Sequence, residues 1–422
     1  MKQSGIDWIG EIPDDWKISK AKTILRNKSI KNHPDAEVLS LYRDLGIVPK
    51  NSRDDNHNVT SDDTASYKFV QKGELVLNKM KTWQGSLAVS DYEGIVSPAY
   101  YVCEFTNQEI DKKYIHYLLR NKMYAQEFER LSTGLRVGQW DLNIDDFLNT
   151  PIVYPPKKAT QQRIAEYLDS KCAQIDSIIE ESKKSIEEYK AWKQSVIFEA
   201  VTGKNLNCKK KDSGIEWIGE IPEGWEVRKI RTIANIIRGG SPRPIDEFMT
   251  NSESGFNWIK IGDTVKGSKY ITSTKTKIIK EGLSKTRIVN PGDLILTNSM
   301  SFGEPYILKI NGCIHDGWVA FSQIIKSVNK EFLYYFLRSS FCNTQFQLQV
   351  DGGVVQNLNI DKIKSTTLFL PPLPEQESIA KMLDSKCAQI DSLIAEKESL
   401  IADLTEYKKS LIFEVVTGKR SV

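Results

Sequence analysis

"LDSKCAQIDS" at residues 168–177 occurs a second time, without a change, at residues 383–392. The likeness continues toward the C-terminal end of each copy, with "IFEAVTGK" at 197–204 and "IFEVVTGK" at 412–419. Each of these second copies lies 215 residues after the first. A constant offset over such a length is the signature of a duplicated unit. The sequence therefore predicts a chain made of two copies of one unit.

A second repeat opens each copy. "SGIDWIGEIPDDW" at 4–16 returns as "SGIEWIGEIPEGW" at 213–225, and "LNIDDF" at 142–147 corresponds to "LNIDKI" at 358–363. The sequences in the middle of each globular segment differ. We infer that the ends match because they attach to the rest of the protein in the same way. The middles differ because each copy recognises something different.

The identical segment belongs to a long predicted helix, because no Pro or Gly interrupts residues 161–201 or 376–416. Apolar residues recur there at helical spacing. In the first copy they are Ile164, Leu168, Cys172, Ile175, Ile179, Ile186 and Tyr189, and in the second Ile379, Leu383, Cys387, Ile390, Ile394, Ile401 and Leu404. Gly203 and Gly418 stand just beyond the helix ends, as stop signals do.

About 40 residues at 1.5 Å per residue give a helix roughly 60 Å long. Such a helix cannot bury its apolar stripe against one small globular domain. The other copy supplies a partner of the same length, so we predict an antiparallel coiled coil about a pseudo-two-fold axis. The alternative is two separate helices, each packed on its own domain.

The globular segments are predicted to be mixed. Residues rich in β-branched and aromatic side chains, bounded by Gly and Pro, predict strands at 68–78, 93–105, 286–298 and 318–325. Amphipathic patterns predict helices at 113–128 and 330–346. The predicted fold class is α+β, with two similar mixed α/β domains joined by two long helices. The predicted boundaries are 1–157 and 209–372 for the two domains, and 158–208 and 373–422 for the two helical regions.

Composition is typical of a folded, cytoplasmic protein. The chain has 422 residues, 40% of them apolar, which is enough for two or three cores. No apolar run approaches the ~18–20 residues of a membrane span, and the N-terminus has no secretory pattern. The six cysteines form no CxxC pair, so we expect six free thiols in a reducing compartment.

The charge is unevenly distributed. The net charge is +3, but residues 161–200 hold six Lys/Arg against eight Asp/Glu, and residues 376–415 hold five against eight. The globular segments are therefore basic. Basic units with mildly acidic helices suit a polyanion held at the domains and a protein partner held along the helices. The alternative is an ordinary scatter of surface charge.

Polar loops of the two basic segments are the candidate DNA-binding sites. Arg, Lys, Asn and Gln suit base edges in the major groove, whereas Lys and glycine-loop amides suit phosphates. In the first segment the candidates are Lys79, Lys81, Trp83, Gln84, Arg136, Gln139 and Trp140. In the second they are Arg238, Ser241, Arg243, Asn298, Ser299, Gln356 and Asn357. The alternative for each loop is a solvated turn.

The sequence contains no convincing catalytic or metal-binding motif. The Pro-Pro pairs "YPPK" and "LPPL" do not fit an amino-methyltransferase, and "GDTVKGSK" at 262–269 has Lys and Ser in the wrong order for a phosphate loop. The four histidines have no metal-ligand spacing. The sequence thus predicts a DNA reader without an active site. Two rivals stay open, a coiled-coil assembly scaffold without DNA specificity and a nuclease with an unfamiliar site.

Taken together, these motifs resemble the DNA specificity subunits of type I restriction–modification enzymes. The resemblance rests on "SGIxWIGEIPxxW", on "PPLPEQESIA" leading into "LDSKCAQID", on the "VTGK" helix ends and on the duplicated layout, and it covers essentially the whole chain. It implies two target-recognition domains, each reading one part of a split, asymmetric site on double-stranded DNA. It also implies a coiled coil that sets the spacer between these parts.

The resemblance implies partners as well. Two methyltransferase (modification) subunits would dock on the chain and bring S-adenosylmethionine, so the chain itself would need no cofactor. Restriction subunits that translocate DNA are a further expected partner. The first copy departs from the pattern at "PPKKATQQ", where the second has "PPLPEQES". The departure concerns the entry into the helix and puts no function in doubt.

Overall fold

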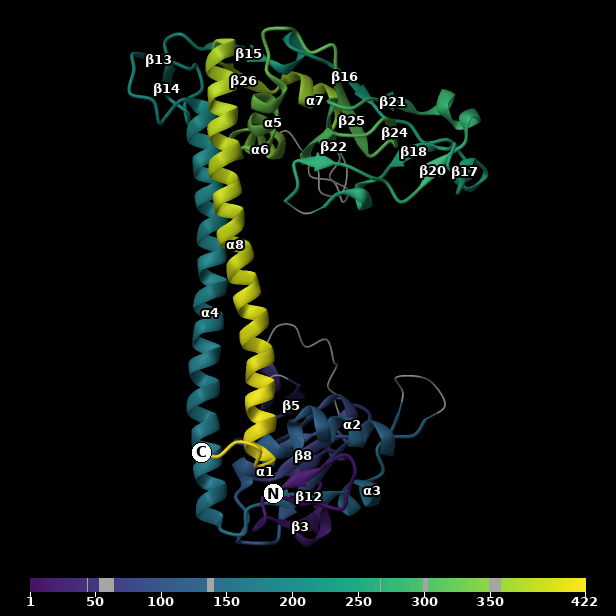
Figure 1. Ribbon diagram of the computed structural model, residues 1–422, viewed down its shortest axis with the longest axis vertical. Helices are drawn as coiled ribbons and strands as arrows, with labels where there is room; N and C mark the ends of the chain where they lie inside the picture. The colour runs from purple at the N-terminus through teal and green to yellow at the C-terminus, as the bar shows by residue number, and fades with distance from the viewer. Residues whose placement is uncertain (44, 53–63, 135–139, 266, 299–302, 349–357) are drawn as a thin grey trace. The chain divides into compact units, whose positions relative to one another are not determined.

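The computed structural model of the protein (Figure 1) describes residues 1–43, 45–52, 64–134, 140–265, 267–298, 303–348 and 358–422. It divides into two compact units. Unit 1 consists of Met1–Ser182 with Ser399–Val422, and unit 2 of Lys183–Glu398. Two long helices, α4 (Lys158–Thr202) and α8 (Leu373–Val416), contribute residues to both units. The predicted α+β class, with two similar mixed domains and two long helices, is confirmed.

Unit 1 is built on a four-stranded antiparallel sheet of order β4-β11-β8-β9, with β4 at Leu25–Lys28, β11 at Tyr100–Phe105, β8 at Leu75–Asn78 and β9 at Leu87–Val89. Shorter ladders pair β1 (Lys2–Gln3) with β2 (Glu11–Ile12), β3 (Lys17–Lys20) with β12 (Pro151–Tyr154), β5 (Leu39–Tyr42) with β6 (Gly46–Pro49), and β7 (Lys68–Val70) with β10 (Gly94–Val96). The helices are α1 (Lys112–Arg120), α2 (Lys122–Leu131) and α3 (Ile144–Asn149). Leu75, Leu77 and Leu87 of the sheet share one buried core with Leu411 and Val415 of α8.

Unit 2 repeats this sheet and extends it. Its order is β16-β25-β22-β23-β19, with β16 at Asn235–Arg238, β25 at Trp318–Ser322, β22 at Leu294–Thr297, β23 at Pro305–Leu308 and β19 at Tyr270–Ile271. The first four strands follow one another as β4, β11, β8 and β9 do in unit 1. Two terminal ladders also recur, β13 (Lys210–Asp212) with β14 (Glu220–Pro222), and β15 (Glu226–Lys229) with β26 (Thr367–Leu370). The helices are α5 (Lys330–Arg338), α6 (Ser340–Leu348) and α7 (Ile360–Ser365).

A second sheet distinguishes unit 2 from unit 1. Its order is β17-β20-β18-β24-β21, with β17 at Met249–Thr250, β20 at Lys277–Ile278, β18 at Phe256–Ile259, β24 at Gly312–Ile314 and β21 at Arg287–Val289. The antiparallel pair β24 and β21 corresponds to β10 and β7 of unit 1. Short 3-10 helices link the strands of both units: η1 (Ala21–Thr23), η2 (Lys50–Ser52), η3 (Thr82–Gln84), η4 (Ile230–Thr232), η5 (Ile245–Phe248), η6 (Ile261–Asp263) and η7 (Lys280–Lys285).

The prediction of one continuous helix at 113–128, and of another at 330–346, is wrong. The first divides into α1 and α2 at Asn121, whose side-chain oxygen accepts the N–H of Tyr124 at 3.2 Å. The second divides into α5 and α6 at Ser339, whose hydroxyl oxygen accepts the N–H three residues later at 3.2 Å. Asn and Ser side chains compete for backbone hydrogen bonds and favour N-caps over helix interiors. Each therefore starts a new helix.

The opening repeat packs against the end of a long helix in both units. In unit 2, Gly203 follows α4 with φ +69°, and a Cβ placed on it would lie 2.5 Å from Pro222. In unit 1, Gly418 follows α8 with φ +73°, and a Cβ placed on it would lie 2.5 Å from Cδ of Pro13. Glycine alone combines this backbone conformation with so close an approach. The end of the "VTGK" repeat therefore packs on the "SGIxWIGEIPxxW" repeat in the same way in both units, and we call this contact the glycine joint.

A fully buried glutamine fastens the first turn of each long helix to its unit. Gln161 accepts the N–H of Asp111 at 2.8 Å and donates to the carbonyl oxygens of Pro155 at 2.9 Å and Glu109 at 3.2 Å. Gln376 bonds an N–H and two carbonyl oxygens of unit 2 in the same way, at 2.8 to 2.9 Å. Each side chain therefore satisfies three backbone groups.

The long helices pair through the same charges in each unit. In unit 1, Lys408 of α8 lies 2.6 and 2.7 Å from the carboxylate oxygens of Asp176 on α4. In unit 2, Lys193 of α4 lies at the same distances from Asp391 on α8. A later position on α4 thus meets an earlier position on α8, so the helices are antiparallel (Figure 1). The alternative of two unpaired helices is excluded.

Candidate nucleic-acid interface

The two units end their central sheets with the same backbone hydrogen bonds. In unit 1, Lys79 directly follows β8. Its N–H donates to Ala99 O at 3.1 Å, and its carbonyl oxygen accepts the N–H of Leu142 at 3.0 Å. The contact joins the β8 end to the β10–β11 turn and to the segment before α3. Three segments far apart in the sequence therefore meet at this edge of the sheet.

In unit 2, Asn298 occupies the same place after β22. Its N–H donates to Gly317 O at 3.0 Å, and its carbonyl oxygen accepts the N–H of Leu358 at 2.9 Å. The backbone frame is the same as in unit 1, while the residue in it carries a buried amide instead of a half-buried ammonium group. We call this pair of hydrogen bonds the edge frame.

The predicted residues of unit 1 lie beside its edge frame. Trp83 on η3 contacts Trp140 with ring centroids 5.2 Å apart and planes inclined by 52°. Lys79 Nζ lies 4.8 Å from the ring centroid of Tyr101. Trp83 is half-buried against the core, and Lys81 is exposed. The described parts of the two loops proposed from the sequence thus lie side by side, and Lys81 is an exposed cation next to them.

Gln84 differs from its prediction in one respect. Its side-chain oxygen accepts a hydrogen bond from Arg43 at 2.5 Å, so this oxygen already has a partner from the β5–β6 turn. Arg136 and Gln139 lie outside the described residues. No DNA contact of unit 1 is established by these positions, which stay predictions.

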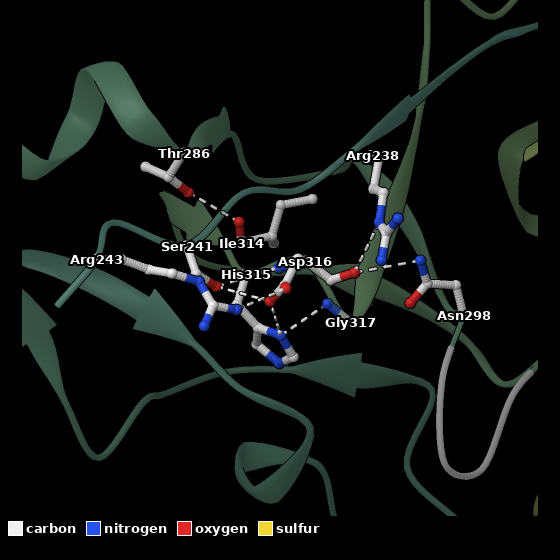
Figure 2. A network of polar contacts seen from close by, with 9 residues as sticks. All are labelled: Arg238, Ser241, Arg243, Thr286, Asn298, Ile314, His315, Asp316 and Gly317. Atoms are coloured by element: carbon white, nitrogen blue, oxygen red, sulfur yellow. Dashed lines mark hydrogen bonds and ion pairs between the residues drawn. The ribbon is translucent and has the colours of Figure 1, made fainter. Parts of the chain in front are cut away.

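In unit 2, the described candidates gather around one residue, Asp316 (Figure 2). The carbonyl oxygen of Asp316 accepts hydrogen bonds from Arg238 Nε at 3.1 Å and Asn298 Nδ2 at 3.2 Å. Its carboxylate accepts the hydroxyl of Ser241 at 2.7 Å, and Arg243 Nη2 lies 3.6 Å from the other carboxylate oxygen. Ser299, Gln356 and Asn357 lie outside the described residues. The structure therefore brings together four of the predicted residues.

The Asp316 carboxylate is negatively charged at neutral pH, because its pKa is lowered. The hydroxyl of Ser241 lowers the pKa of Asp316, with smaller contributions from His315 and Arg243, against an opposing effect of partial burial. Burial lowers the pKa of His315, whose Nδ1 accepts the N–H of Gly317 at 2.8 Å. The ring is thus a neutral acceptor at this atom, and the carboxylate is the charged acceptor of the cluster.

Two glycines let the loop after β16 reach this turn. The N–H of Gly239 donates to Trp318 O at 2.9 Å, and that of Gly240 to Ile314 O at 3.1 Å. A Cβ on Gly239 would lie 2.7 Å from Ile314 O, and one on Gly240 would lie 2.6 Å from Lys285 O. Side chains at these positions would push the loop away. The "RGGSPRP" segment therefore needs both glycines to hold Ser241 and Arg243 beside Asp316.

A cavity of about 620 Å³ adjoins the cluster. Its lining combines cationic, aromatic and aliphatic side chains: Ser241, Pro242, Arg243, Pro244, Ile245, Trp258, Lys260, Ile261 and His315. Lys260 and Arg243 are the cations of this lining. The cavity lies between the loop after β16 and the second sheet of unit 2; in the described residues of unit 1 the corresponding pair, β7 and β10, forms a two-stranded sheet.

Sequence reasoning missed Asp316 and His315. "IHDGW" reads as an ordinary Asp-Gly turn between two strands, so the carboxylate attracts no attention there. No local sequence signal marks these residues, because β25 brings this turn to the edge that carries Asn298 by pairing with β22, which is distant in sequence. Within the described ranges, no group of three or more His, Cys, Asp or Glu side chains is arranged to hold a metal ion.

Family membership follows from the sequence. The sequence model of the type I restriction modification DNA specificity domain matches residues 13–188 and 222–401. The chain belongs to this family. It is accordingly a specificity subunit of a type I restriction–modification system and not its enzyme. The family's recognition domain occurs twice, once in each copy that the repeats define.

Relatives in the specificity-subunit family span nearly the whole chain. The type I restriction enzyme MjaVIII specificity subunit of Methanocaldococcus jannaschii is 26% identical over 97% of this chain and 93% of the relative. The type I restriction enzyme EcoBI specificity subunit of Escherichia coli is 25% identical over 75% of this chain and 68% of the relative.

Solved structures share the fold. A chain from a study of complex assembly and conformational transition of the type I R-M system superposes with a TM-score of 0.76 at 15% identity, covering 97% of this chain and 100% of that one. The HsdS subunit from Thermoanaerobacter tengcongensis superposes with a TM-score of 0.58 at 15% identity, covering 97% and 98%. Every helix in the described part of this specificity subunit is too short or too polar to span a bilayer.

Proposed function

We propose that the chain reads a bipartite, asymmetric DNA site, with unit 1 and unit 2 each recognising one half-site. The observation that carries this proposal is the edge frame, which both units share while the exposed side chains of the loops beside it differ, with Lys81 in unit 1 and Arg243 in unit 2. Base edges are distinguished by the donors and acceptors that meet them. Two units of one construction with different polar side chains therefore suit two different half-sites. Identical units would read a palindrome.

The predicted loop residues are the proposed DNA contacts, and among those that the structure describes, Lys81, Arg238 and Arg243 are exposed cations. Phosphate contacts position a protein on the duplex, and contacts with base edges specify the sequence. The apposed Trp83 and Trp140 support the loop that carries Lys81. The carboxylate of Asp316 keeps Ser241 and Arg243 at the corresponding surface of unit 2.

The long helices are the proposed spacer and docking surface. α4 has 45 residues and α8 has 44, and both contribute to unit 1 and to unit 2. A continuous helix of that length is roughly 65 Å long and stiff, so it suits a fixed separation between half-sites. We assign the helices to the docking of two modification subunits, and S-adenosylmethionine to those subunits. Restriction subunits complete the proposed assembly.

Sequencing methylated adenines in a host with and without the gene tests the bipartite site. The expected result is a split motif that disappears with the gene. Exchanging residues 78–86 for those of a relative should change one half of the motif, and exchanging residues 236–244 should change the other. The idea of two independent readers fails if both halves change together. Replacing Arg238 with Ala should cost about 1–3 kcal/mol at one position of one half.

The spacer has a test of its own. Inserting four residues, about one helical turn, within 178–190 adds ~6 Å of helix, against a rise of ~3.4 Å per base pair of DNA. The spacer in the methylated motif should lengthen by about one base pair. An unchanged motif from a folded, active variant would contradict the proposal that the helices set the spacer. It would not affect the proposal that each unit recognises one half-site.

A further inference from the structure

We infer that Arg243 and Asp316 act as a pair that reads one G·C base pair in the half-site of unit 2. The inference rests on the proposed function above. The guanidinium would donate to O6 and N7 of guanine, and the carboxylate would accept the exocyclic amino group of the paired cytosine. Four observations support this inference. They are the distance between the two side chains, their exposure, the hydrogen bonds that hold Asp316 in place, and the order of donors and acceptors that the pair offers.

The two charges are neighbours without being a closed ion pair. Arg243 Nη2 lies 3.6 Å from Asp316 Oδ2. By contrast, Arg228 lies 2.7 Å from Glu226 in the same unit. Charge-assisted N–H···O bonds usually measure about 2.7–2.9 Å. Arg243 and Asp316 therefore keep hydrogen-bonding capacity that a closed ion pair would use.

Both side chains are accessible to a ligand. Arg243 is 81% exposed and Asp316 is 44% exposed. The carboxylate is nevertheless held in place, because Ser241 donates to Oδ1 at 2.7 Å. The carbonyl oxygen of Asp316 receives Arg238 and Asn298 at 3.1 and 3.2 Å, which fixes the backbone beneath it (Figure 2). Oδ2 is left facing Arg243.

A carboxylate on a DNA-binding surface restricts its own partner. It repels phosphates and cannot accept from guanine O6, guanine N7 or thymine O4, which are acceptors themselves. The donors in the major groove are the amino groups of cytosine and adenine. A phosphate-binding role for Arg243 is disfavoured for the same reason, since the neighbouring Asp316 would weaken it.

The neighbouring arginine favours the G·C pair over the A·T pair. A G·C pair presents the two guanine acceptors side by side, with the cytosine amino group next to them. In an A·T pair, the amino group stands between adenine N7 and thymine O4. A guanidinium fork next to a carboxylate offers two adjacent donors and then an acceptor. This order matches guanine and cytosine.

In unit 1, a proline takes the position of Asp316. Trp318 faces Thr297 in the ladder as Tyr100 faces Asn78, so Asp316 of unit 2 corresponds in position to Pro98 of unit 1. Proline has no acceptor in its side chain. The effect of the pair should therefore be confined to the half-site of unit 2.

The experiment uses the full chain produced together with its modification subunits. The methylated motif of the unaltered protein is determined first, and exchange of residues 78–86 identifies the half-site of unit 1. Arg243→Gln and Asp316→Asn are then tested by methylation mapping and by competition between duplexes that differ at one base pair. Both substitutions are expected to lower the discrimination in favour of the same single G·C pair by roughly 10- to 100-fold. Every other position should be retained.

Glu226→Gln is the matched control, because it removes an exposed carboxylate that pairs with Arg228 in the same unit. Its motif should equal that of the unaltered protein. The pair is refuted if the half-site of unit 2 contains no G·C pair, if the two variants affect different positions, or if neither changes the motif. If Asp316→Asn does not fold, Arg243→Gln decides alone. A uniform, salt-dependent weakening would then make Arg243 a phosphate contact.

The exchange of residues 78–86 distinguishes an error in the inference about Arg243 and Asp316 from an error in the proposed function. If the pair alone is wrong, the exchange of residues 78–86 still changes one half of the motif and leaves the other. If the proposed function is wrong, that exchange changes both halves or the motif does not depend on the chain.

Discussion

Unit 1 and unit 2 are alike where they meet the long helices and different where their sheets end. The helix side repeats a glycine against a proline, a buried glutamine with three backbone partners, and a Lys–Asp pair. The sheet edge repeats only backbone hydrogen bonds, and the side chains there differ. Buried backbone groups and close approaches accept few residue types, whereas the exposed side chains of loops beside the sheet edge, such as Lys81 and Arg243, can vary widely. A duplicated unit can therefore change what it reads and keep its attachment.

The comparison predicts its largest effect at the buried glutamines. Replacing Gln161 or Gln376 with Leu should lower the free energy of unfolding by about 3–5 kcal/mol, because one N–H and two carbonyl groups would lose their partners. Denaturant unfolding, followed separately for each unit, measures the loss. Exposed Gln162→Leu is the control and should stay within about 0.5 kcal/mol. A loss in one unit without a loss in the other would show that the units are fastened differently.

The glycine joints should give the next largest effect. Gly203→Ala and Gly418→Ala should each cost about 2–4 kcal/mol, the sum of a left-handed backbone and an overlap with proline. Gly5→Ala and Gly214→Ala isolate the backbone part, because φ is +74° and +72° there and nothing lies within 4 Å of an added Cβ.

These two control substitutions should cost about 1–2 kcal/mol. The measurement is the unfolding free energy of the four variants under one set of conditions. Equal losses in all four variants would mean that the close approach to proline contributes nothing. The glycines would then be needed only for their left-handed backbone conformation.

The repeated ion pairs offer a finer comparison. Lys193 is 11% exposed beside Asp391, and Lys408 is 28% exposed beside Asp176. Greater exposure means stronger solvent screening. A double-mutant cycle should therefore give a coupling energy of about 1 kcal/mol for Lys193 with Asp391 and a few tenths for Lys408 with Asp176. The reverse order would contradict the argument from screening.

The smallest expected effect comes from moving the chain ends. Both termini belong to unit 1 (Figure 1). Gly418 lies close to Pro13 there, and Val422 packs against the core that contains Ile9. Joining Val422 to Met1 through about eight residues and opening the exposed link at Asn207–Cys208 should keep the fold and both half-sites.

Thermal unfolding and the methylated motif of the permuted chain measure this. Opening the chain inside α4, between Glu187 and Glu188, is the control and should cost stability, because it interrupts a continuous helix. A permuted chain that is soluble and inactive would reject the joint between the two ends of the sequence.

The duplication, the long helices and the α+β class were readable from the sequence because they depend on local patterns. Apolar residues such as Leu168 and Leu383 recur at helical spacing, and Gly203 and Gly418 mark the helix ends. The helix breaks at Asn121 and Ser339 were missed, although both residue types favour N-caps. The prediction followed the amphipathic period, which runs through both helices of each pair, and gave too little weight to a single N-cap residue.

The edge of each sheet was decided by tertiary structure. Trp83 and Trp140 were predicted as separate loops, and the contact between them arises because Leu142 bonds the carbonyl oxygen of Lys79. Asp316 carries no sign of its role in an ordinary Asp-Gly turn, and becomes the centre of the cluster when β22 and β25 pair. A helix follows from side-chain spacing along a few turns. Which loops share a surface depends on strand pairing between residues far apart in sequence, and no local pattern encodes it.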